Sequence, residues 1–573
     1  MANKESGFSL QDVVYNLDAG MGLHILRILL YIGMVMVLAM LYTASQFRGL
    51  NNESAMDSAQ IARNISYGRG YTTKNISPVS LTYVWRMNPE QRGRVQNHPE
   101  LIRPPLYPAL LASVFRVSRG TLQPFDGRGT YAPEQYFITP INNALSIITG
   151  FLVFLIGRKL FDRRLGFLAM TVYYLSDVIW STSITGTELP LLLFLTTTSF
   201  YSIMLAAEAR ENNSKLIKWM IPYLIAAGTC VLAFLTRYGA FFMLPTIALY
   251  IALRFKTGRL LWVSVFTALF FAGIAPWLLR NYLSFGMPLG LAPYMMFNDG
   301  HGSWLADITS SLSLGQFFGR GVFRSWTSNV ASFYRSDLHM PGMGLLAAFF
   351  FASFFYGFAR RDVRIFRWSV ALGIFALVSI AGFFGRDTIR LLYVFSPFVM
   401  IYGLAFFFLL LERMRISFRF VEISVISLVI ASAALPLVFT LMPPRAALPY
   451  PPYYPPFISY VSSLMRPGEL MSTDMPWATA WYGDQDSLRL PHQIDHFYDI
   501  NDNIHLISGL YFTTITRDQP FVRTLRTGRY RTWFPVMGGQ IPQDFPLSSG
   551  FPLNNLDQLF LTDYRRWQEG PRE

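Results

Sequence analysis

The chain has 573 residues, of which 52% are apolar and only 14% are charged, against roughly 25% charged residues in a soluble domain. This composition excludes a simple soluble globule and, with a mean hydropathy of +0.32, indicates a protein that crosses a membrane many times. The net charge is +14, but the basic residues are spread between apolar blocks, which argues against nucleic-acid binding. Cys230 is the one cysteine, so an intramolecular disulfide and a cysteine-based zinc site are excluded.

Eleven apolar blocks approach or exceed the length needed to cross roughly 30 Å of hydrocarbon at about 1.5 Å per helical residue. The first, residues 25–44, follows an amino-terminal segment of residues 1–24, and we expect an uncleaved span because further spans follow. The pattern predicts a polytopic α-helical membrane protein with about 11 transmembrane helices within residues 25–441. The ten later blocks are residues 139–157, 165–184, 188–206, 218–236, 239–253, 261–278, 342–359, 367–384, 391–411 and 420–441.

Short basic connections alternate with the other connections between these blocks. Because positive charge in a short loop resists translocation, we place the basic connections and the amino terminus in the cytoplasm. Two long loops, residues 44–138 and 279–341, and the carboxyl terminus are then extracytoplasmic. The basic connections lie around residues 158–164, 210–218, 254–259, 360–367 and 413–419.

The first long loop contains an apolar stretch, residues 103–115, that is short and begins with two prolines after Arg103. We expect a helix that lies in the membrane interface. The alternative, a further span, would place every later basic connection outside, which is why the interfacial interpretation is preferred.

A separate domain is predicted at the carboxyl end. Residues 442–456 form a linker rich in proline and tyrosine, and residues 457–573 are the expected extracytoplasmic domain. Residues 477–481 predict a helix, with Asp484 and Asp486 in the turn that follows it, so we expect a small α/β domain. The segments expected to be strands are residues 469–473, 487–491 and 504–512.

Two carboxylates are candidate catalytic groups, because this topology places them at the outer face. Asp57 lies in a helical pattern that puts Glu53 on the same face, and Glu188 begins the predicted span at residues 188–206. An acid at the edge of a span is costly to bury and is therefore a functional candidate. The alternatives are a solvated helix face for Asp57 and a helix cap for Glu188. His98 is a lone loop histidine that could touch a substrate or a metal.

Basic side chains are predicted at the same outer boundary. Guanidinium groups bind phosphate through charge-assisted, bidentate hydrogen bonds, so together these side chains favour a phosphorylated ligand. Any one of them taken alone is more often a residue whose charge simply reaches the membrane interface. The candidate phosphate-binding residues are Arg63, Lys74, Arg237, Arg280, Arg386 and Arg390.

A series of motifs runs in a defined order between about residues 20 and 440. The motifs are Ile61-Ala-Arg-Asn, Gly68-Arg-Gly-Tyr-Thr-Thr, Arg103-Pro-Pro-Leu-Tyr-Pro, Thr187-Glu-Leu-Pro, Leu235-Thr-Arg-Tyr and Ala275-Pro-Trp-Leu-Leu-Arg-Asn-Tyr. This series resembles the membrane-embedded GT-C glycosyltransferases, the broad family of protein O-mannosyltransferases and lipid A aminoarabinose transferases. The resemblance implies a GT-C fold and a sugar donor linked to polyprenyl phosphate.

In that family an acid of the first outer loop is the catalytic carboxylate, and the resemblance gives this role to Asp57 or Glu53. The family's adjacent Asp-Glu pair is absent, and Asp57 is favoured because it lies one helical turn before Ile61. We expect Asp57 to accept the proton of an acceptor hydroxyl in an inverting displacement, with Glu188 orienting the acceptor. The residues expected to stabilise the departing phosphate are Arg237, Arg280 and Arg386.

Other functions stay open at this point. A divalent metal between Asp57 and the phosphate is possible, although no dedicated ligand cluster is evident. The alternatives to a glycosyltransferase are a transporter, an assembly factor, or a lipid-phosphate hydrolase that uses the same arginines. A transporter would favour two matching halves, and none is visible in the sequence. A bacterial inner-membrane location follows from the resemblance, whereas the sugar and the class of acceptor (protein, lipid or glycan) do not.

Overall fold

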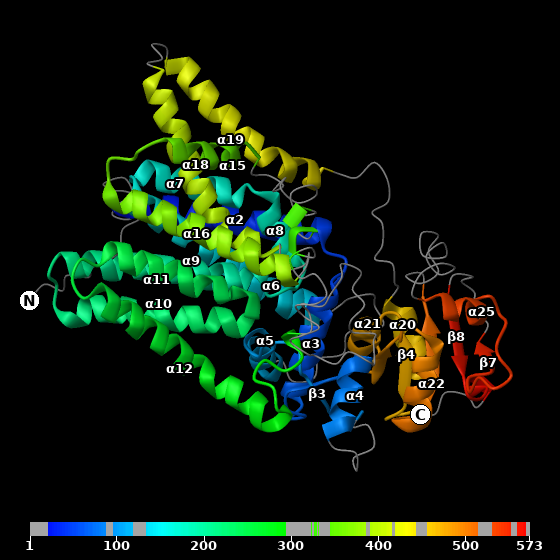
Figure 1. The fold of residues 1–573 in the computed structure, drawn as a ribbon. Helices are drawn as coiled ribbons and strands as arrows, with labels where there is room; N and C mark the ends of the chain where they lie inside the picture. The colour runs from blue at the N-terminus through cyan, green and yellow to red at the C-terminus, as the bar shows by residue number, and fades with distance from the viewer. Residues whose placement is uncertain are drawn as a thin grey trace, which may run out of the picture.

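The computed structural model consists of a large helical body with a smaller α/β domain at one side (Figure 1). The amino-terminal and central parts of the chain form the helical body, and the last part of the chain, orange to red in Figure 1, forms most of the α/β domain. The structure describes residues 21–87, 95–117, 133–293, 323, 326–328, 330–331, 344–384, 390–414, 419–442, 455–513, 530–551 and 558–568.

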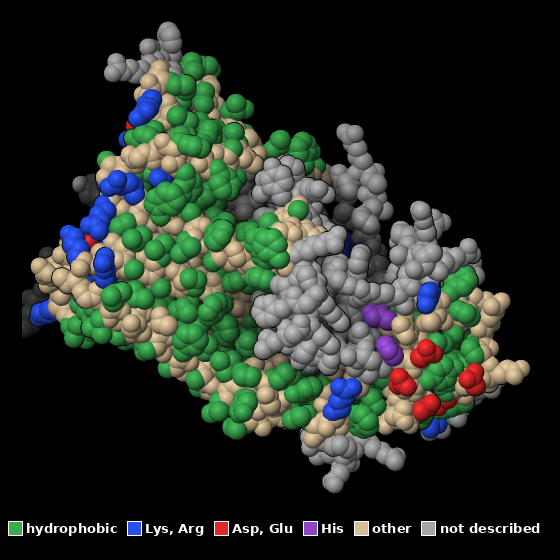
Figure 2. Space-filling model, viewed as in Figure 1, with side chains coloured by type: hydrophobic (Ala, Val, Ile, Leu, Met, Phe, Trp, Pro, Cys, Tyr) green, Lys and Arg blue, Asp and Glu red, His purple; other side chains and the backbone are tan. Residues whose placement is uncertain are grey.

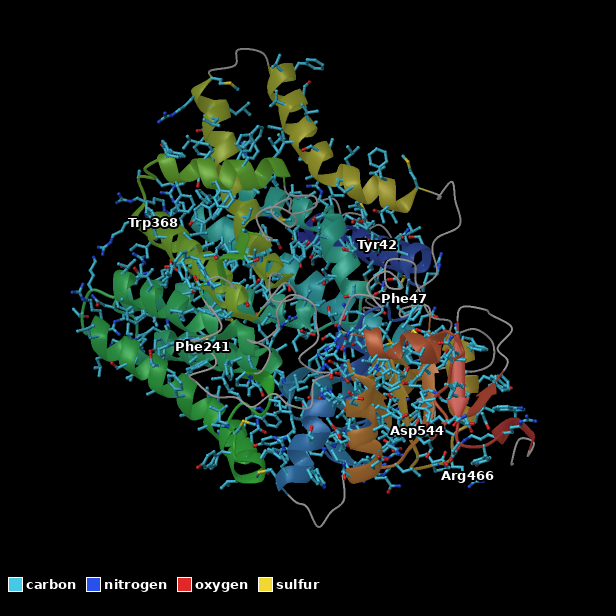
Figure 3. The ribbon with its side chains drawn as sticks, turned by 45° about the vertical axis from the view of Figure 1, so that its right-hand side comes forward. Tyr42, Phe47, Phe241, Trp368, Arg466 and Asp544 are labelled. Carbon is cyan, nitrogen blue, oxygen red and sulfur yellow. The ribbon has the colours of Figure 1, made fainter. Side chains whose placement is uncertain are left out.

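Eight helices in the described part of the chain are long and apolar enough to cross a membrane. They are α2 (Met21–Gln46), α6 (Thr139–Leu160), α9 (Leu189–Glu211), α10 (Leu216–Thr236), α12 (Arg259–Phe285), α16 (Arg361–Phe384), α18 (Ser396–Arg413) and α19 (Arg419–Leu441). Most residues of α9 and α18 are buried inside the body, whereas α2, α12 and α19 are mostly exposed. Phe241 and Trp368 are among the exposed aromatic side chains of the body (Figure 3). Such apolar surface is what lipid would cover.

Three predicted spans are shorter or interrupted in the structure. Residues 165–184 form two successive helices, residues 239–253 begin with a 3-10 turn, and residues 342–359 contribute one short helix followed by a 3-10 turn. The helices concerned are α7 (Arg163–Tyr174), α8 (Asp177–Ile184), α11 (Met243–Arg254) and α15 (Gly344–Ala352). The predicted class, a polytopic helical protein, is confirmed, while the count of eleven crossings stays a prediction.

The basic connections meet at one end of the helical body. Arg360 donates to the Leu160 carbonyl at 2.8 Å, and Arg361 donates to the Leu253 carbonyl at 3.2 Å. The neighbouring Arg254 forms an ion pair with Glu211 at 2.6 Å. Four connections that are far apart in sequence therefore lie together. On the face that Figure 2 shows, Lys and Arg gather along this end, away from the α/β domain.

The first long loop folds against the other end of the helical body, where α9 starts. The loop's first helix, α3 (Glu53–Ser66), begins where the Asn52 side chain accepts a hydrogen bond from the Ser54 amide at 2.8 Å. The expected apolar helix after Arg103 is present as α5, which packs on α3. The remaining elements are β1 (Thr72–Thr73), β2 (Asn75–Ile76), α4 (Pro78–Met87), β3 (His98–Pro99) and α5 (Leu106–Val117).

The α/β domain has a six-stranded sheet in the order β2-β5-β4-β6-β8-β7. The first four of these strands are parallel to one another, and β8 and β7 complete the sheet in antiparallel pairs. The expected strands and the expected helix α21 are confirmed, since hydrophobic patterning and turn residues mark them locally. The elements are α20 (Pro455–Ser463), β4 (Leu470–Thr473), α21 (Pro476–Tyr482), β5 (Ser487–Arg489), α22 (Ile494–Asn503), β6 (Ile507–Phe512), α25 (Phe534–Met537), β7 (Ser549–Phe551) and β8 (Leu559–Thr562).

One edge of this sheet comes from the first long loop. Asn75 pairs with Ser487 and Ile76 with Leu488 in parallel register, so β2 extends the sheet beside β5. Ile76 and Leu81 are fully buried in the same hydrophobic core as Leu488. The predicted domain boundary at residue 457 therefore omits part of the domain. A two-residue strand carries too little pattern to reveal a partner about 400 residues away.

Candidate active site

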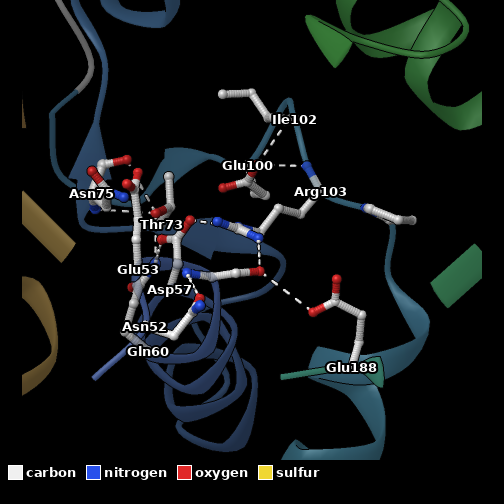
Figure 4. A network of polar contacts seen from close by, with 12 residues as sticks. Asn52, Glu53, Asp57, Gln60, Thr73, Asn75, Glu100, Ile102, Arg103 and Glu188 are labelled. Atoms are coloured by element: carbon white, nitrogen blue, oxygen red, sulfur yellow. Dashed lines mark hydrogen bonds and ion pairs between the residues drawn. The ribbon is translucent and has the colours of Figure 1, made fainter. Parts of the chain in front are cut away.

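A network of charged and polar side chains joins the first long loop to the helical body (Figure 4). Arg103 lies at its centre, where Nε donates to Asp57 Oδ2 at 2.5 Å and Nη1 donates to Ser54 Oγ at 2.7 Å. The Ser54 hydroxyl donates to Glu188 Oε2 at 3.4 Å, and Arg237 Nη1 donates to Glu188 Oε1 at 2.8 Å. Both predicted carboxylates are buried. They therefore belong to one continuous network at the end of the body where the first long loop packs.

Helix α3 and the β1–β2 turn hold Asp57 in place. Gln60 lies one helical turn after Asp57, with Nε2 3.3 Å from Asp57 Oδ1 and 2.6 Å from the Thr73 hydroxyl. The side-chain oxygen Oε1 of Gln60 accepts a hydrogen bond from the Lys74 backbone amide at 3.1 Å. The buried amide of Gln60 thus connects the candidate base to the chain segment that enters β2. Such contacts around a reactive group restrict its position.

A tight turn between α8 and α9 presents Glu188. Gly186 has a φ of +74°, which is favourable only for glycine. The Tyr107 hydroxyl donates to the Gly186 carbonyl at 2.7 Å, and the Asn142 side chain donates to the Thr187 carbonyl at 3.2 Å. These two buried hydrogen bonds orient the turn, so that Glu188 reaches both Ser54 and Arg237.

We expect Gly186→Ala to destabilise the protein by about 1–3 kcal/mol. The new Cβ would require the unfavourable positive φ and would lie 2.4 Å from the Leu50 side chain. Thermal unfolding of the purified protein in detergent measures the effect. Gly228→Ala is the matched control, because a Cβ at this helical position meets nothing within 4 Å. Equal melting temperatures for both variants would contradict the prediction.

Glu100 is a third acid beside this network. Its Oε1 accepts hydrogen bonds from the backbone amides of Ile102 at 2.7 Å and Arg103 at 2.8 Å. Burial and the negative charge of Asp57 raise the pKa of Glu100 to about 7, although Arg103 and the two amides act in the opposite direction. Glu100 is therefore a carboxyl group that exchanges its proton near neutral pH close to Asp57.

The raised pKa of Glu100 predicts how stability changes with pH. The folded chain holds this proton more tightly than the unfolded chain, whose carboxyl has an ordinary pKa of 4.5. The contribution of Glu100 to the free energy of unfolding is therefore greatest at acid pH and falls as the pH rises from about 4.5 through about 7. Glu100→Gln keeps an acceptor oxygen but removes the titration. We expect this variant to melt at a higher temperature than wild type at pH 8, with a smaller difference at pH 5, in a series of thermal melts. Parallel melting curves for the two proteins across this range would refute the assignment.

Arg280, near the end of α12, lies among aromatic rings next to the network. Its guanidinium carbon is 5.8 Å from the centre of the Tyr71 ring and 5.1 Å from the Trp277 ring. The Tyr71 hydroxyl lies 3.0 Å from the carbonyl oxygen of Arg103, and the Trp277 indole donates to the Tyr238 hydroxyl at 2.9 Å. Arg280 is thus held beside the chain segment that carries Arg103.

Two of the predicted phosphate-binding residues are engaged elsewhere. Arg63 is buried, and its terminal nitrogens donate to the carbonyls of Ala480 and Trp481 and to Asp484. Lys74 forms an ion pair with Asp484 at 3.0 Å. Arg63 and Lys74 therefore share one carboxylate of the α/β domain in this structure, and their assignment to a phosphate site stays a prediction.

The remaining predicted residues are placed as follows. Arg386 and the side chain of Arg390 lie outside the described residues. Glu53 forms an ion pair with Arg489 of β5, and the buried His98 lies 2.5 Å from the Ser80 hydroxyl. Within the described residues, the ion pair of Glu53 is with Arg489 and not with the Arg103 network. Asp57 belongs to the Arg103 network, whereas Glu53 pairs with the α/β domain, and the choice between them as the catalytic carboxylate stays a prediction.

Arg103 and Glu100 are members of the network that sequence reasoning did not select. Arg103 is expected only as the start of an interfacial helix, and Glu100 is not distinguished from other loop acids. A usable signal is present, since the two opposite charges lie three residues apart immediately before an apolar helix. Charges at such an edge are costly unless they are paired or functional.

The described residues contain no group of three or more His, Cys, Asp or Glu side chains that could hold a metal ion. A divalent metal between Asp57 and a phosphate stays a prediction from the sequence.

Several solved structures resemble this chain in fold, although their sequences are only distantly similar. No family model matches the chain, and no curated protein matches it. Similar solved structures include the archaeal oligosaccharyltransferase AglB from Archaeoglobus fulgidus, in complex with an inhibitory peptide and a dolichol-phosphate. It has a TM-score of 0.55 and 11% identity, covering 88% of this chain and 71% of that one. ArnT from Cupriavidus metallidurans, bound to undecaprenyl phosphate, has a TM-score of 0.52 and 9% identity, covering 94% of this chain and 98% of that one.

The chain has the GT-C fold. A third structure, an Archaeoglobus fulgidus oligosaccharyltransferase tethered with an acceptor peptide, matches with a TM-score of 0.55 and 11% identity, covering 94% of this chain and 74% of that one. The fold implied by the motif series is thereby confirmed, with the α/β domain following the membrane helices. At these identities the likeness concerns the fold, and the chemistry of this GT-C protein must be argued from its own residues.

Proposed function

We propose that the chain is an integral-membrane glycosyltransferase that moves a sugar from a polyprenyl-phosphate donor to an acceptor on the extracytoplasmic face. The observation that carries this proposal is the partly buried network of Asp57, Arg103, Ser54, Glu188 and Arg237 in a GT-C fold. It combines carboxylates that can accept a proton with guanidinium groups that can bind a phosphate. These are the two functions that transfer from a sugar phosphate requires.

In the proposed reaction, an acceptor hydroxyl attacks the anomeric carbon of the sugar. Asp57 accepts the hydroxyl proton while the new glycosidic bond forms, and the bond between the anomeric carbon and the phosphate oxygen breaks. The bonding electrons leave with the phosphate, which becomes more negative. A single displacement of this kind inverts the anomeric configuration. Glu188, held by Ser54 and Arg237, is positioned to orient the acceptor.

Arg103, Arg237 and Arg280 are the proposed phosphate ligands. The side chains of Arg103 and Arg237 are 23% and 25% exposed, unlike Arg63 at 3%, so a ligand can still reach them. Within the described residues, Arg103 binds Asp57 and Ser54 through Nε and Nη1, which leaves Nη2 for the phosphate.

The lipid part of the donor is argued from the fold and from the membrane topology. The described AglB and ArnT structures hold dolichol-phosphate and undecaprenyl phosphate, respectively, which supports a polyprenyl-phosphate donor here. We assign the basic end of the body, around Arg254 and Arg360, to the cytoplasm. The site and the α/β domain then face outward, with the amino terminus cytoplasmic, as in a multi-pass protein of a bacterial inner membrane.

The assay that tests this function uses the purified protein in lipid bilayers. A panel of radiolabelled undecaprenyl- and dolichyl-phosphate sugars is offered with a membrane extract as the source of acceptor. We expect label to move to the acceptor only when protein is present, and unlabelled undecaprenyl phosphate to compete. Equal label with and without protein would refute the proposal.

Each alternative function gives a different result in this assay. Release of free sugar or inorganic phosphate without acceptor labelling identifies a hydrolase. Movement of the intact donor across sealed vesicles without bond cleavage identifies a transporter. Absence of both donor binding and turnover is the result expected for an assembly factor.

A further inference from the structure

One short stretch of the α/β domain, residues 480–489, contacts both ends of the helix that carries Asp57. We call the contacts of Arg63 with Ala480, Trp481 and Asp484 the grip. Near the end of α3, Arg63 Nη1 donates to the Trp481 carbonyl at 2.8 Å, and Nη2 donates to Ala480 at 2.7 Å and Asp484 at 2.9 Å. At the start of α3, Glu53 forms an ion pair with Arg489. Residues 480–489 thus contact α3 on either side of Asp57.

Two backbone carbonyls, one carboxylate and one aromatic ring surround the Arg63 guanidinium. The carbonyls of Ala480 and Trp481 belong to the last turn of α21, where backbone carbonyls lack helical partners and favour a cation. The Arg63 guanidinium also lies 4.9 Å from the centre of the Trp481 ring. Burial alone would raise the pKa of Asp484, but the charges of Arg63, Lys74 and Arg69 outweigh it and lower the pKa. Asp484 is therefore ionised and neutralises the buried arginine.

Arg63 and Asp57 lie close together on the same helix, α3. Arg63 lies six residues after Asp57, which is about 9 Å along a helix axis. A third connection runs through Gln60, which binds the Lys74 amide next to β2, the strand that pairs with β5. These three connections lead us to expect that a shift of the α/β domain moves α3, and with it the Asp57 carboxylate.

We propose that α21 and the turn after it are a positioning element for catalysis, in which Asp484 acts through Arg63 to fix the placement of Asp57. This proposal rests on the proposed glycosyltransferase function. Asp484 and Arg63 are positioning residues, since neither touches the network around Arg103. The α/β domain then has a role in the chemical step that is separate from any recognition of the acceptor.

The test compares conservative variants at this grip with a matched control. Arg63→Lys keeps the charge but loses the two-pronged geometry of the guanidinium. Asp484→Asn keeps the side-chain shape and suits the positive φ of +49° at this position. Arg566→Lys is the control, because Arg566 is equally buried at 3% but pairs with Glu469 and Asp563 inside the α/β domain.

We expect Arg63→Lys and Asp484→Asn to lower kcat about tenfold or more with little change in the KM for the donor, since misplacement by about 1 Å can cost 100-fold. The variant that combines Arg63→Lys with Asp484→Asn should have a kcat no lower than that of the slower single variant, because both substitutions act through one contact. Arg566→Lys should keep the wild-type kcat. Unchanged kcat in both grip variants, or an equal loss in Arg566→Lys, overturns the proposal.

Hydrogen exchange of residues 53–66 gives a readout that does not need activity. The grip variants should exchange faster than wild type in this helix, and Arg566→Lys should not. If the wild-type protein transfers no sugar, the proposed function fails, and exchange alone then decides whether the grip orders α3. Unchanged exchange in α3 of Arg63→Lys and Asp484→Asn would overturn the positioning role in either case.

Discussion

Asp57→Asn is expected to lower the kcat of sugar transfer by about 10²- to 10⁴-fold, the range for loss of a general base. Asparagine has a similar shape and can still accept the hydrogen bond from Arg103, so the network should remain assembled. It cannot accept the proton of the attacking hydroxyl. Donor binding should therefore persist while transfer is lost, which single-turnover kinetics with a labelled donor can separate.

Asp177→Asn is the matched control for this experiment. Asp177 accepts a hydrogen bond from the Tyr42 hydroxyl at 3.0 Å and has no described contact with the Arg103 network. The control should transfer sugar at close to the wild-type rate. Full activity of Asp57→Asn would remove Asp57 from the mechanism, and Glu53→Gln would then be the informative variant.

Trp481→Ala should have the largest effect on stability, a loss of about 3–5 kcal/mol in the free energy of unfolding. Trp481 is fully buried and stacks on Phe115 of α5, with ring centres 6.5 Å apart. Its indole nitrogen donates to Glu134 Oε1 at 2.6 Å, at the entrance to α6. The substitution opens a cavity between the α/β domain and the helical body and leaves a buried carboxylate oxygen without its donor. Urea titration in detergent measures the loss.

Two further variants separate packing from hydrogen bonding at this position. Trp481→Phe keeps an aromatic ring but removes the indole donor, so its loss should be smaller, about 1–3 kcal/mol. Trp477→Ala, on the same helix, removes a half-buried ring that contacts Arg489 and should cost less than Trp481→Ala. Equal losses for the two alanine variants would show that Trp481 is not the anchor between the domains.

Local sequence patterns were sufficient to predict several helices and strands of this protein. The apolar lengths predicted the membrane helices, and alternation with turn residues predicted β4, α21 and β5, because these elements depend on neighbouring residues. The edge-of-span argument selected Glu188, and helical spacing selected Asp57. The structure places both acids in one hydrogen-bonded network.

Charge in a sequence does not identify the partner that neutralises it. Arg63 and Lys74 fit a phosphate site by position and residue type, yet their partner Asp484 lies about 400 residues later in the chain. Arg103 and Glu100, which were not selected, lie beside Asp57. Each outcome depends on a long-range contact, and such contacts leave no periodicity in the sequence.

The sequence by itself determined the membrane class, the order of the helices and the residue types available in each loop, because length, hydropathy and charge act locally. Only the tertiary structure decided which of these charges share a site. A cation binds whichever anion the fold brings within about 3 Å. For Arg63 and Lys74 this depends on how β2 joins the sheet and how α21 docks on α3.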